Sequence, residues 1–386
     1  MINPGGHLSI DEIVGRTAEV ARYWTILERQ SLVLGAERRI GKTHIVLKMH
    51  EEGRTGAVTF FQELEAIHGV LELVRSVYRT VRDHLPRAAR AKARAIEVWD
   101  GFLPTKLGNL ELPQAFSKWK ALLSGAIEDV LDAVEPDHKV IFIWDEFPLM
   151  LYNIVQREGP NTAIELLDLL RHLRQMHGAR LRFLLNGSIG LHLVLRGLRK
   201  SGNSNAPIND MQLETVPPMI RTEAEEVATR ALGHLPSPPP DIPAVAALIV
   251  DATGGYPYHV HHFVDQLSLL GRAPMAADVE AVVTKLLSDD DDVANFGYYV
   301  ERISTHYDAP EVARALAVLD AIARADGGIT LETLTNLVRH SNDQWTDEDV
   351  KATCVDLRRD HYLSLSGGLY GFRWPLLKRW WRENRT

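Results

Sequence analysis

The sequence has little cysteine, no long apolar run and no excess of positive charge, and each shortage excludes a class of protein. Cys354 is the single cysteine in 386 residues, which rules out an intramolecular disulfide and a zinc site built from several thiolates. No apolar run reaches the roughly 18 residues that indicate a membrane-spanning helix, and no secretion signal follows Met1. We therefore expect a soluble, cytoplasmic protein with no membrane partner.

Composition and charge are those of a folded, mildly acidic protein. Apolar residues make up 45% of the chain, whereas disordered chains combine low hydrophobicity with high charge. A length prior of roughly 100–200 residues per domain predicts two or three domains. The formal charge is −8, because 43 Lys and Arg stand against 51 Asp and Glu. This balance excludes a globally basic surface for nucleic acid but not a local basic patch.

The chain from Ser9 to about Pro218 alternates strand-like apolar runs with helical patterns, which indicates an α/β domain with a parallel sheet. Four runs look like buried strands and a weaker fifth follows, at residues 31–34, 57–61, 140–144, 181–185 and 211–216. From about Pro310 the pattern changes to three helices, a hairpin over Tyr362–Phe372 and a last helix. That second order of elements is typical of a winged helix-turn-helix.

The strongest motif is Gly41-Lys42-Thr43, which lies between a buried strand and an apolar helix. Backbone N–H groups of such a loop and the helix N-terminus concentrate positive potential on a phosphate. Lys42 would reach the β- and γ-phosphates of a nucleotide, and the Thr43 hydroxyl would ligate Mg²⁺. Ala36 stands where the usual motif has a glycine, and its extra methyl group predicts only a slight conformational cost.

A second motif is the pair Asp145-Glu146, which follows the apolar strand 140–144. A strand of this kind delivers both carboxylates to the carboxyl edge of the sheet, beside the phosphate loop. Asp145 would hold Mg²⁺ and Glu146 would polarise the water that attacks the γ-phosphate. The alternative is a strand followed by acidic residues that begin a helix. With the phosphate loop, the pair predicts the core of an ATPase site that takes ATP and Mg²⁺.

A third strand, at residues 181–185, delivers Asn186 and Ser188 to the same edge. Either side chain could hydrogen-bond the γ-phosphate or the attacking water, and so respond to the state of the nucleotide. A plain Asn-Gly turn is the alternative interpretation.

These motifs together resemble those of the prokaryotic and archaeal ATPases of the STAND/AAA+ group, which are relatives of the origin-recognition type. The resemblance covers about Ile13 to Trp381 and includes the motifs Val14-Gly-Arg16 and Thr253-Gly-Gly-Tyr-Pro257. It implies an α/β fold with a P-loop NTPase parallel-sheet core, a helical lid and a C-terminal winged helix-turn-helix. The implied domains are residues 1–220, 221–305 and 306–386.

The resemblance also implies roles for individual residues. Arg16 would lie near the adenine pocket, and Pro257 of the lid would report the state of the nucleotide. Arg199, with Arg196 as the other candidate, stands where an arginine finger that acts across subunits is expected; two arginines at a helix end are also ordinary complements of the helix dipole. The implied nucleotide-binding positions in the loop are Ala36, Arg39, Ile40, Gly41, Lys42, Thr43 and His44.

The lid departs from the family pattern because it lacks an obvious sensor-2 arginine. Its helix carries His259, His261 and His262 instead. These histidines either form a weak metal cluster or serve in packing and at the surface, and we favour the second interpretation. Without the arginine, slow hydrolysis that drives a switch fits better than a motor.

Charge separates the candidate partners. Residues 310–386 carry eleven Lys and Arg and eleven Asp and Glu, so the winged helix predicts a protein contact rather than a stand-alone DNA binder. A better basic patch lies between Arg75 and Arg94, where seven cations and one acid give +6. A nucleic acid or an acidic partner would bind this patch, and a solvated helix face is the alternative.

We therefore expect an ATP-binding protein with slow Mg²⁺-dependent hydrolysis, used as a conformational switch in signalling, defence or regulated assembly. A protein partner or a homo-oligomer is expected. One alternative is a DNA-binding AAA+ ATPase of the origin-recognition or mobile-element type. The other is a scaffold that holds ATP without hydrolysing it.

Overall fold

The computed structural model describes residues 13–85, 112–187, 190–200, 202, 205–289 and 291–386. The chain divides into two units. The first, here called the α/β unit, consists of Arg16–Gly35 and Lys42–Val216. The second, the C-terminal unit, consists of Met1–Gly15, Ala36–Gly41 and Pro217–Thr386. The loop Ala36–Gly41 therefore clusters with the C-terminal residues, although the chain on both sides of it belongs to the α/β unit.

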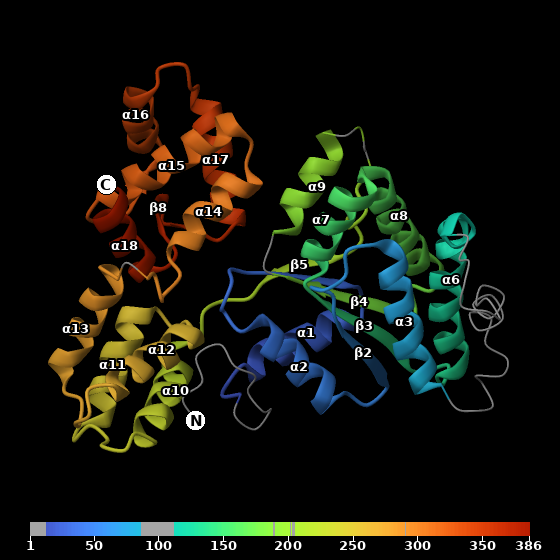
Figure 1. The fold of residues 1–386 in the computed structure, drawn as a ribbon, viewed down its shortest axis with the longest axis horizontal. Coiled ribbons are helices and arrows are strands. Elements are labelled where there is room, and N and C mark those ends of the chain that lie inside the picture. Colours follow the sequence, from blue (N-terminus) through green and yellow to red (C-terminus); the bar gives the residue numbers. More distant parts are fainter. Residues whose placement is uncertain (1–12, 86–111, 188–189, 201, 203–204, 290) are drawn as a thin grey trace. The chain divides into compact units, whose positions relative to one another are not determined.

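The α/β unit contains a five-stranded sheet with helices on both faces (Figure 1). Its elements are α1 (Thr17–Leu27), β1 (Leu32–Gly35), α2 (Lys42–Glu52), β2 (Ala57–Glu63), α3 (Val70–His84), α6 (Leu112–Ala133), β3 (Lys139–Asp145), α7 (Phe147–Glu158), α8 (Pro160–Met176), β4 (Leu181–Asn186), α9 (Leu191–Lys200) and β5 (Gln212–Thr215). The five strands predicted from the sequence are confirmed, and no end differs from the prediction by more than two residues.

All pairs in the sheet are parallel, in the order β2-β3-β4-β1-β5. Helix α2 leads from β1 to the distant edge strand β2, and the later connections return across the sheet in the opposite direction. Because parallel crossovers are right-handed, α2 lies on one face and α3, α6, α7 and α8 lie on the other (Figure 1). The carboxyl ends of all the strands share one edge, and that edge carries the predicted site.

The core follows the two-residue period of the strands. In β3, Val140, Phe142 and Trp144 are buried in the cluster that α3, α6, α7 and α8 complete. Ile141 and Ile143 are also buried but stand on the opposite face of the strand. A strand that is covered on both faces is apolar throughout. This is why residues 140–144 form a continuous apolar run in the sequence.

The C-terminal unit consists mainly of helices. Its elements are α10 (Arg221–Gly233), α11 (Ile242–Thr253), α12 (Pro257–Ser268), α13 (Ala276–Leu287), α14 (Gly297–His306), α15 (Ala309–Arg324), β6 (Ile329–Thr330), α16 (Leu331–Ser341), α17 (Asp347–Arg359), β7 (Leu363–Ser366), β8 (Leu369–Phe372) and α18 (Pro375–Arg385). Helix α15 packs against α16, α17 and α18, and α10 packs against α11 and α12. Among the described residues no helix combines the length and the apolar character needed to cross a membrane.

The C-terminal end of this unit has the order of elements that the sequence predicted. Thr346 caps α17, since its hydroxyl accepts from Asp349 N and the Asp349 carboxylate accepts from Thr346 N. Strands β7 and β8 pair antiparallel through a two-residue turn in which Gly367 and Gly368 both have positive φ, at 57° and 80°. Such a turn needs positive φ at both positions, which glycine adopts without strain. The predicted hairpin is confirmed.

Candidate functional site

The loop after β1 brings its backbone into conformations that side chains disfavour. Gly41 has φ of +92°, and Arg39 has φ of 69° although it carries a bulky side chain. The loop is anchored by apolar side chains, since Ala36 is 4% and Ile40 0% exposed. Helix α2 then begins at Lys42, which is itself buried. A tight loop that opens directly into a helix N-terminus is the arrangement that binds phosphate.

Thr43, in the first turn of α2, contacts Asp145 at the end of β3. The Thr43 hydroxyl donates a hydrogen bond to Asp145 Oδ2 over 2.6 Å. Asp145 is 2% exposed, and burial is the main cause that raises the pKa of its carboxyl, while the Thr43 hydrogen bond acts in the opposite direction. The structure therefore joins the two residues that the sequence assigned to Mg²⁺, which lie about a hundred positions apart in the chain.

Glu146 follows in a left-handed backbone conformation, with φ of 54°, and caps the N-terminus of α7. Its backbone N–H donates to Asp145 Oδ1 over 2.9 Å. Its side chain reaches the end of β4, because a Cβ placed on Gly187 would lie 3.2 Å from Glu146 Oε2. Any side chain at Gly187 would also collide with Pro148. Glycine at this position thus allows Glu146 to approach the strand that carries Asn186.

Asn186 is the last residue of β4 and is 1% exposed. Trp144 lies opposite Leu185 in the sheet register, so Asp145 and Asn186 end neighbouring strands. Within the part of the chain that the structure describes, neither the Oδ1 nor the Nδ2 atom of Asn186 has a hydrogen-bond partner. An unsatisfied buried amide is costly and rare in folded proteins. This side chain therefore has a donor and an acceptor that remain available to a ligand. Ser188, its predicted companion, lies outside the described residues.

The other predicted residues occupy separate places. Arg16 is the N-cap residue before α1, is 3% exposed and donates to Glu19 over 2.9 Å. His44 is half-buried in the first turn of α2. In α9, Arg196 is half-buried, whereas Arg199 is exposed in the last turn. An exposed arginine at a helix end fits either a contact across subunits or a complement to the helix dipole.

The lid motif is built around a close backbone approach. Gly255 has φ of +79°, and a Cβ there would lie 2.5 Å from Met219 O. Pro257 is the first residue of α12. His259 and His262 are both buried, and burial lowers the pKa of each, that of His259 well below its ordinary value. His259 stacks on Trp374 with ring centroids 4.2 Å apart, a packing contact of a neutral ring.

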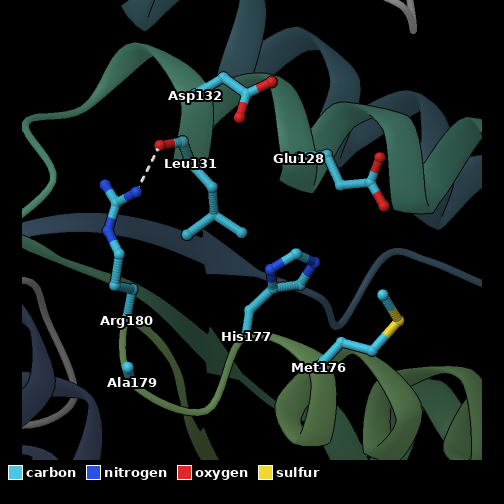
Figure 2. A pocket seen from close by; sticks show the side chains of 7 residues that line it. All are labelled: Glu128, Leu131, Asp132, Met176, His177, Ala179 and Arg180. Carbon is cyan, nitrogen blue, oxygen red and sulfur yellow. Dashed lines mark hydrogen bonds between the residues drawn. The ribbon is translucent and has the colours of Figure 1, made fainter.

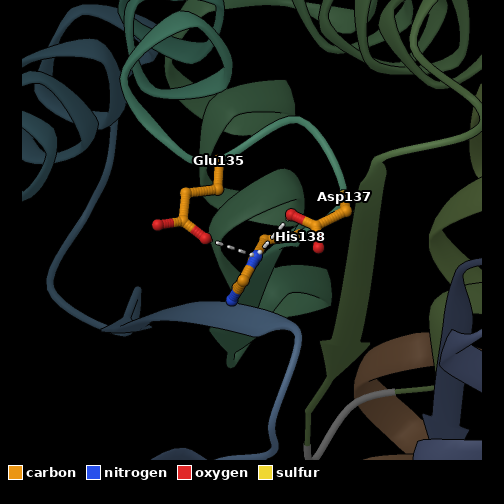
Figure 3. Close-up of side chains that lie close together, drawn as sticks. All are labelled: Glu135, Asp137 and His138. Carbon is orange, nitrogen blue, oxygen red and sulfur yellow. Dashed lines mark hydrogen bonds and ion pairs between the residues drawn. The ribbon is translucent and has the colours of Figure 1, made fainter.

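Two features at the opposite edge of the sheet are separate from this site. Met176, His177 and Arg180 help to line a pocket of about 420 Å³ (Figure 2). In the turn before β3, Glu135, Asp137 and His138 converge (Figure 3). Among the described residues this trio, and not the lid histidines, is the group that has metal-ligand spacing. Both of its acids are exposed, and their contacts to His138 Nδ1 at 3.5 and 3.0 Å account for the cluster without an ion.

Sequence reasoning missed the acidic residue inside the phosphate loop. Glu37 is 2% exposed; within the C-terminal unit it accepts a hydrogen bond from Tyr256, pairs with Arg373 and lies close to His361. No local signal marks Glu37 as buried, because its partners lie more than two hundred residues along the chain. The motif Gly255-Tyr256-Pro257 is recognisable in the sequence from its proline, whereas the residue that contacts Glu37 is Tyr256.

Solved structures of other proteins share the fold described above. No protein-family model and no curated protein matches the chain. Among solved structures, the Walker-type ATPase PABY2304 of Pyrococcus abyssi is similar with a TM-score of 0.66 and 17% identity, over 99% of both chains. The Aeropyrum pernix ORC2 protein, solved as ADPNP–ADP complexes, has a TM-score of 0.53 and 13% identity, over 96% of this chain and 92% of that one.

The class of fold follows from these observations. The parallel sheet, the loop between β1 and α2, and the acidic end of β3 form the α/β core of an AAA+ P-loop NTPase fold. The predicted fold class is thereby confirmed for its parallel-sheet α/β core. At these identities the similarity to the Pyrococcus ATPase and the Aeropyrum ORC2 protein concerns the fold, and the activity of this chain has to be argued from its own residues.

Proposed function

We propose that this protein binds ATP with Mg²⁺ and hydrolyses it slowly, as a switch between two conformations. The observation that carries the proposal is the buried Asn186 amide, which has no hydrogen-bond partner among the described residues and ends the strand beside the Thr43–Asp145 hydrogen bond. A donor and an acceptor at the edge of a phosphate-binding fold suit the γ-phosphate and the water that attacks it.

The residues that would hold the nucleotide form a consistent set. The backbone of Ala36–Gly41 and the Lys42 ammonium supply positive potential to the phosphates. The Thr43 hydroxyl and the Asp145 carboxylate are oxygen ligands of the kind that Mg²⁺ prefers. The bound ion would neutralise charge on the phosphate oxygens. The same charge would favour the ionised form of Asp145, against the burial that raises its pKa.

Glu146 is the proposed base. Its carboxylate lies against Gly187, at the end of the strand that carries Asn186, so the two side chains can hold a water molecule between them. Glu146 would accept a proton as that water attacks, while Asn186 fixes its orientation. Arg199 is the residue we propose for the contact with a neighbouring subunit, since it is exposed at the end of α9.

Slow turnover follows from the lid. An arginine in this part of an AAA+ protein would stabilise charge that develops on the phosphates. Here α12 carries His259, which is buried, and its pKa lies well below the ordinary value. A neutral ring supplies no compensating charge at pH 7. The lid is then suited to report the bound nucleotide through Pro257, and less suited to accelerate its hydrolysis. We place the lid at residues 221–305, between a nucleotide-binding domain of 1–220 and a winged helix of 306–386.

The experiment compares ATP binding and turnover of the wild type with two variants in the presence of Mg²⁺. Lys42→Ala is expected to lose both binding and turnover, and Glu146→Gln to lose turnover alone. Lys48→Ala is the matched control, because Lys48 lies in the same helix and pairs with Glu52 over 3.1 Å. ATP binding by Lys42→Ala that equals the wild type, or its absence in the wild type, contradicts the proposal.

A DNA-binding ATPase is the second candidate, and one observation favours it. Arg75, Arg79 and Arg82 lie exposed on α3 at spacings of four and three residues, and therefore on one face. Only Arg82 has an acidic partner among the described residues, Asp83 at 3.0 Å. The later cations of this basic stretch, Arg87, Arg90, Lys92 and Arg94, lie outside the described residues.

Duplex DNA distinguishes this candidate. If it is correct, DNA binding weakens as salt rises, and neutralising Arg75, Arg79 and Arg82 reduces both the affinity and any stimulation of turnover. The control is the triple neutralisation of Arg221, Arg230 and Arg272, which are equally exposed but bonded to acids. Equal loss in the two triple variants would indicate only a general effect of net charge.

A further inference from the structure

The phosphate loop contains a buried acid that phosphate binding does not require. Glu37 lies four residues before Gly41 and is 2% exposed. A carboxylate repels phosphate, and burying its charge is unfavourable unless a cation and hydrogen bonds compensate it. The partners of Glu37 therefore show what this position is for.

Those partners come from two distant parts of the C-terminal unit. The Tyr256 hydroxyl, in the lid motif, donates a hydrogen bond to Glu37 Oε1. The same oxygen lies 3.3 Å from Arg373 Nε, just after β8. His361, just before β7, places Nδ1 3.8 Å from Glu37 Oε2. One carboxylate thus contacts the lid and both ends of the β7–β8 hairpin.

The two hairpin residues are also bonded to each other. Arg373 Nη1 lies 2.8 Å from His361 Nδ1, and because a guanidinium only donates, the imidazole accepts there. His361 itself has φ of 66°, a conformation that costs free energy for a residue with a side chain. It persists because the backbone is held on both sides, by His361 N to Arg358 O and by Arg373 N to Tyr362 O.

Aromatic packing connects the same elements. Trp374 follows Arg373 and stacks on Tyr256 and His259, with ring centroids 5.4 and 4.2 Å apart. Trp374 and Tyr256 are 2% and 1% exposed. Tyr256, which bonds Glu37, and Trp374, which follows Arg373 in the chain, therefore belong to one closely packed cluster. In such a cluster a displacement of one side chain displaces the others.

The next two loop residues are anchored in the same unit. The Arg39 guanidinium lies 3.9 Å from the centre of the Tyr258 ring and donates to Ala294 O over 3.3 Å. Arg38 lies over Tyr298 at 4.9 Å. Three successive side chains of the phosphate loop are thus held by α12, by α14 and its preceding loop, and by the hairpin.

We propose that Glu37, Tyr256, Arg373 and His361 form a latch that couples the conformation of the phosphate loop to the β7–β8 hairpin. The role of the latch residues is to position the loop. This inference rests on the proposed function and names the regulation of that same site: ATP binding and attachment of the hairpin are linked, so each changes the other by the same factor. A partner that displaced the hairpin would release the nucleotide.

Charge gives the latch a distinctive mutational signature. Replacing Arg373 by methionine leaves the Glu37 carboxylate buried without its cation, so the loop has to rearrange to hydrate it. Replacing Glu37 by glutamine as well removes the charge that needed compensation. The double variant is therefore expected to recover much of what the single variant loses.

The first measurement is ATP affinity by equilibrium dialysis for the wild type, Glu37→Gln, Arg373→Met and the double variant. Arg373→Met is expected to bind ATP at least about tenfold more weakly, and the double variant to recover to within about threefold of the wild type. Arg379→Met is the control, since Arg379 pairs with the exposed Glu280 over 2.8 Å outside the latch. Independent, additive effects of the two substitutions, or Arg373→Met binding like the control, overturn the latch.

The second measurement is amide hydrogen exchange over residues 361–374, with and without ATP. In the wild type, ATP is expected to change the exchange rate of these amides, and in the double variant the change is expected to vanish although ATP still binds. A wild type that binds ATP without any change in the hairpin overturns the latch alone. A wild type that does not bind ATP overturns the proposed function with it. Far-UV circular dichroism and thermal melts of each variant separate these outcomes from a failure to fold.

Discussion

The Thr43 hydroxyl donates its single proton to Asp145 Oδ2 over 2.6 Å, so the Thr43 oxygen can now act only as an acceptor or as a ligand. A hydroxyl oxygen keeps two lone pairs after it has donated. Thr43 can therefore ligate a cation without losing its bond to Asp145, and the bond holds both oxygens in place beforehand. The first turn of α2 and the end of β3 are thus held together in the way that the proposed Mg²⁺ site requires.

The burial of Asp145 predicts a dependence of stability on pH. Burial raises the pKa of this carboxyl in the folded chain above its ordinary value near 3.8. Between pH 3.8 and the raised pKa, the folded chain binds more protons at Asp145 than the unfolded chain does. The free energy of unfolding therefore falls as the pH rises through this range. Asp145→Asn removes the titrating charge, although its single amide oxygen can accept from only one of the two donors that Asp145 binds, the Thr43 hydroxyl and the Glu146 N–H. The melting temperature of the nucleotide-free wild type is therefore expected to fall more steeply with rising pH than that of Asp145→Asn.

Asp137→Asn is the control for that measurement. Asp137 is exposed, and its pKa is lowered by the hydrogen bond from His138, so its charge does not destabilise the fold. Melting curves of the wild type and of both variants from pH 4.5 to pH 8 provide the comparison. An Asp145→Asn protein whose melting temperature depends on pH as steeply as that of the wild type contradicts the interpretation.

Asn186→Ala is expected to separate stability from activity. The Asn186 amide is buried, and neither of its polar atoms has a partner among the described residues, so its removal should leave the free energy of unfolding unchanged or raise it by about 1 kcal/mol. Turnover should fall roughly a hundredfold, the usual effect of losing one preorganised group in an active site. Thermal denaturation and steady-state ATP turnover measure the two quantities. The exposed Asn336→Ala is the control, and a destabilised Asn186→Ala protein would mean that the amide serves the fold.

Glu146→Gln tests whether hydrolysis matters. Loss of a general base is expected to reduce turnover by about 10²–10⁴-fold, while ATP affinity stays close to that of the wild type because the loop and Lys42 are intact. Single-turnover hydrolysis and dialysis measure these separately. If the protein is instead a scaffold that only holds ATP, the wild type will show no more turnover than the variant, and both will carry out its cellular role equally.

The sheet and the centre of the site could be predicted because their signals are local. An apolar run covered on both faces, as in β3, identifies a buried strand, and the residue after it lies at the carboxyl edge of a parallel sheet. Asp145 and Asn186 were placed in this way, and the register of β3 and β4 confirms that they end neighbouring strands. The topology requires this proximity for any residue in those two positions.

Glu37 could not be predicted, because its burial depends on partners remote in sequence. A glutamate in a loop is normally exposed, and nothing in the sequence connects it with Arg373. The C-terminal segment of residues 372–382 is both aromatic and basic, and from the sequence alone it fits either packing within the unit or a surface that binds a partner. In the structure Trp374 and Trp381 are buried, and Arg382 and Arg385 pair with Asp326 and Asp320. To decide between packing and a partner surface, one has to know that Asp320 of α15 and Asp326 after it lie beside these arginines. The periodicity of the sequence does not reveal which acids lie there.

The pair Arg302–Asp360 is expected to contribute more to stability than the surface ion pairs of the same unit. The two side chains are 2% and 0% exposed, and Asp360 also accepts from the Tyr307 hydroxyl. Arg302→Met leaves the Asp360 charge buried without its cation, which costs about 3–5 kcal/mol. Arg339 pairs with the exposed Asp347 over 2.9 Å, and Arg339→Met should cost less than about 1 kcal/mol. Urea unfolding of both variants measures the difference, and equal midpoints would show that the buried pair contributes no more than an exposed one.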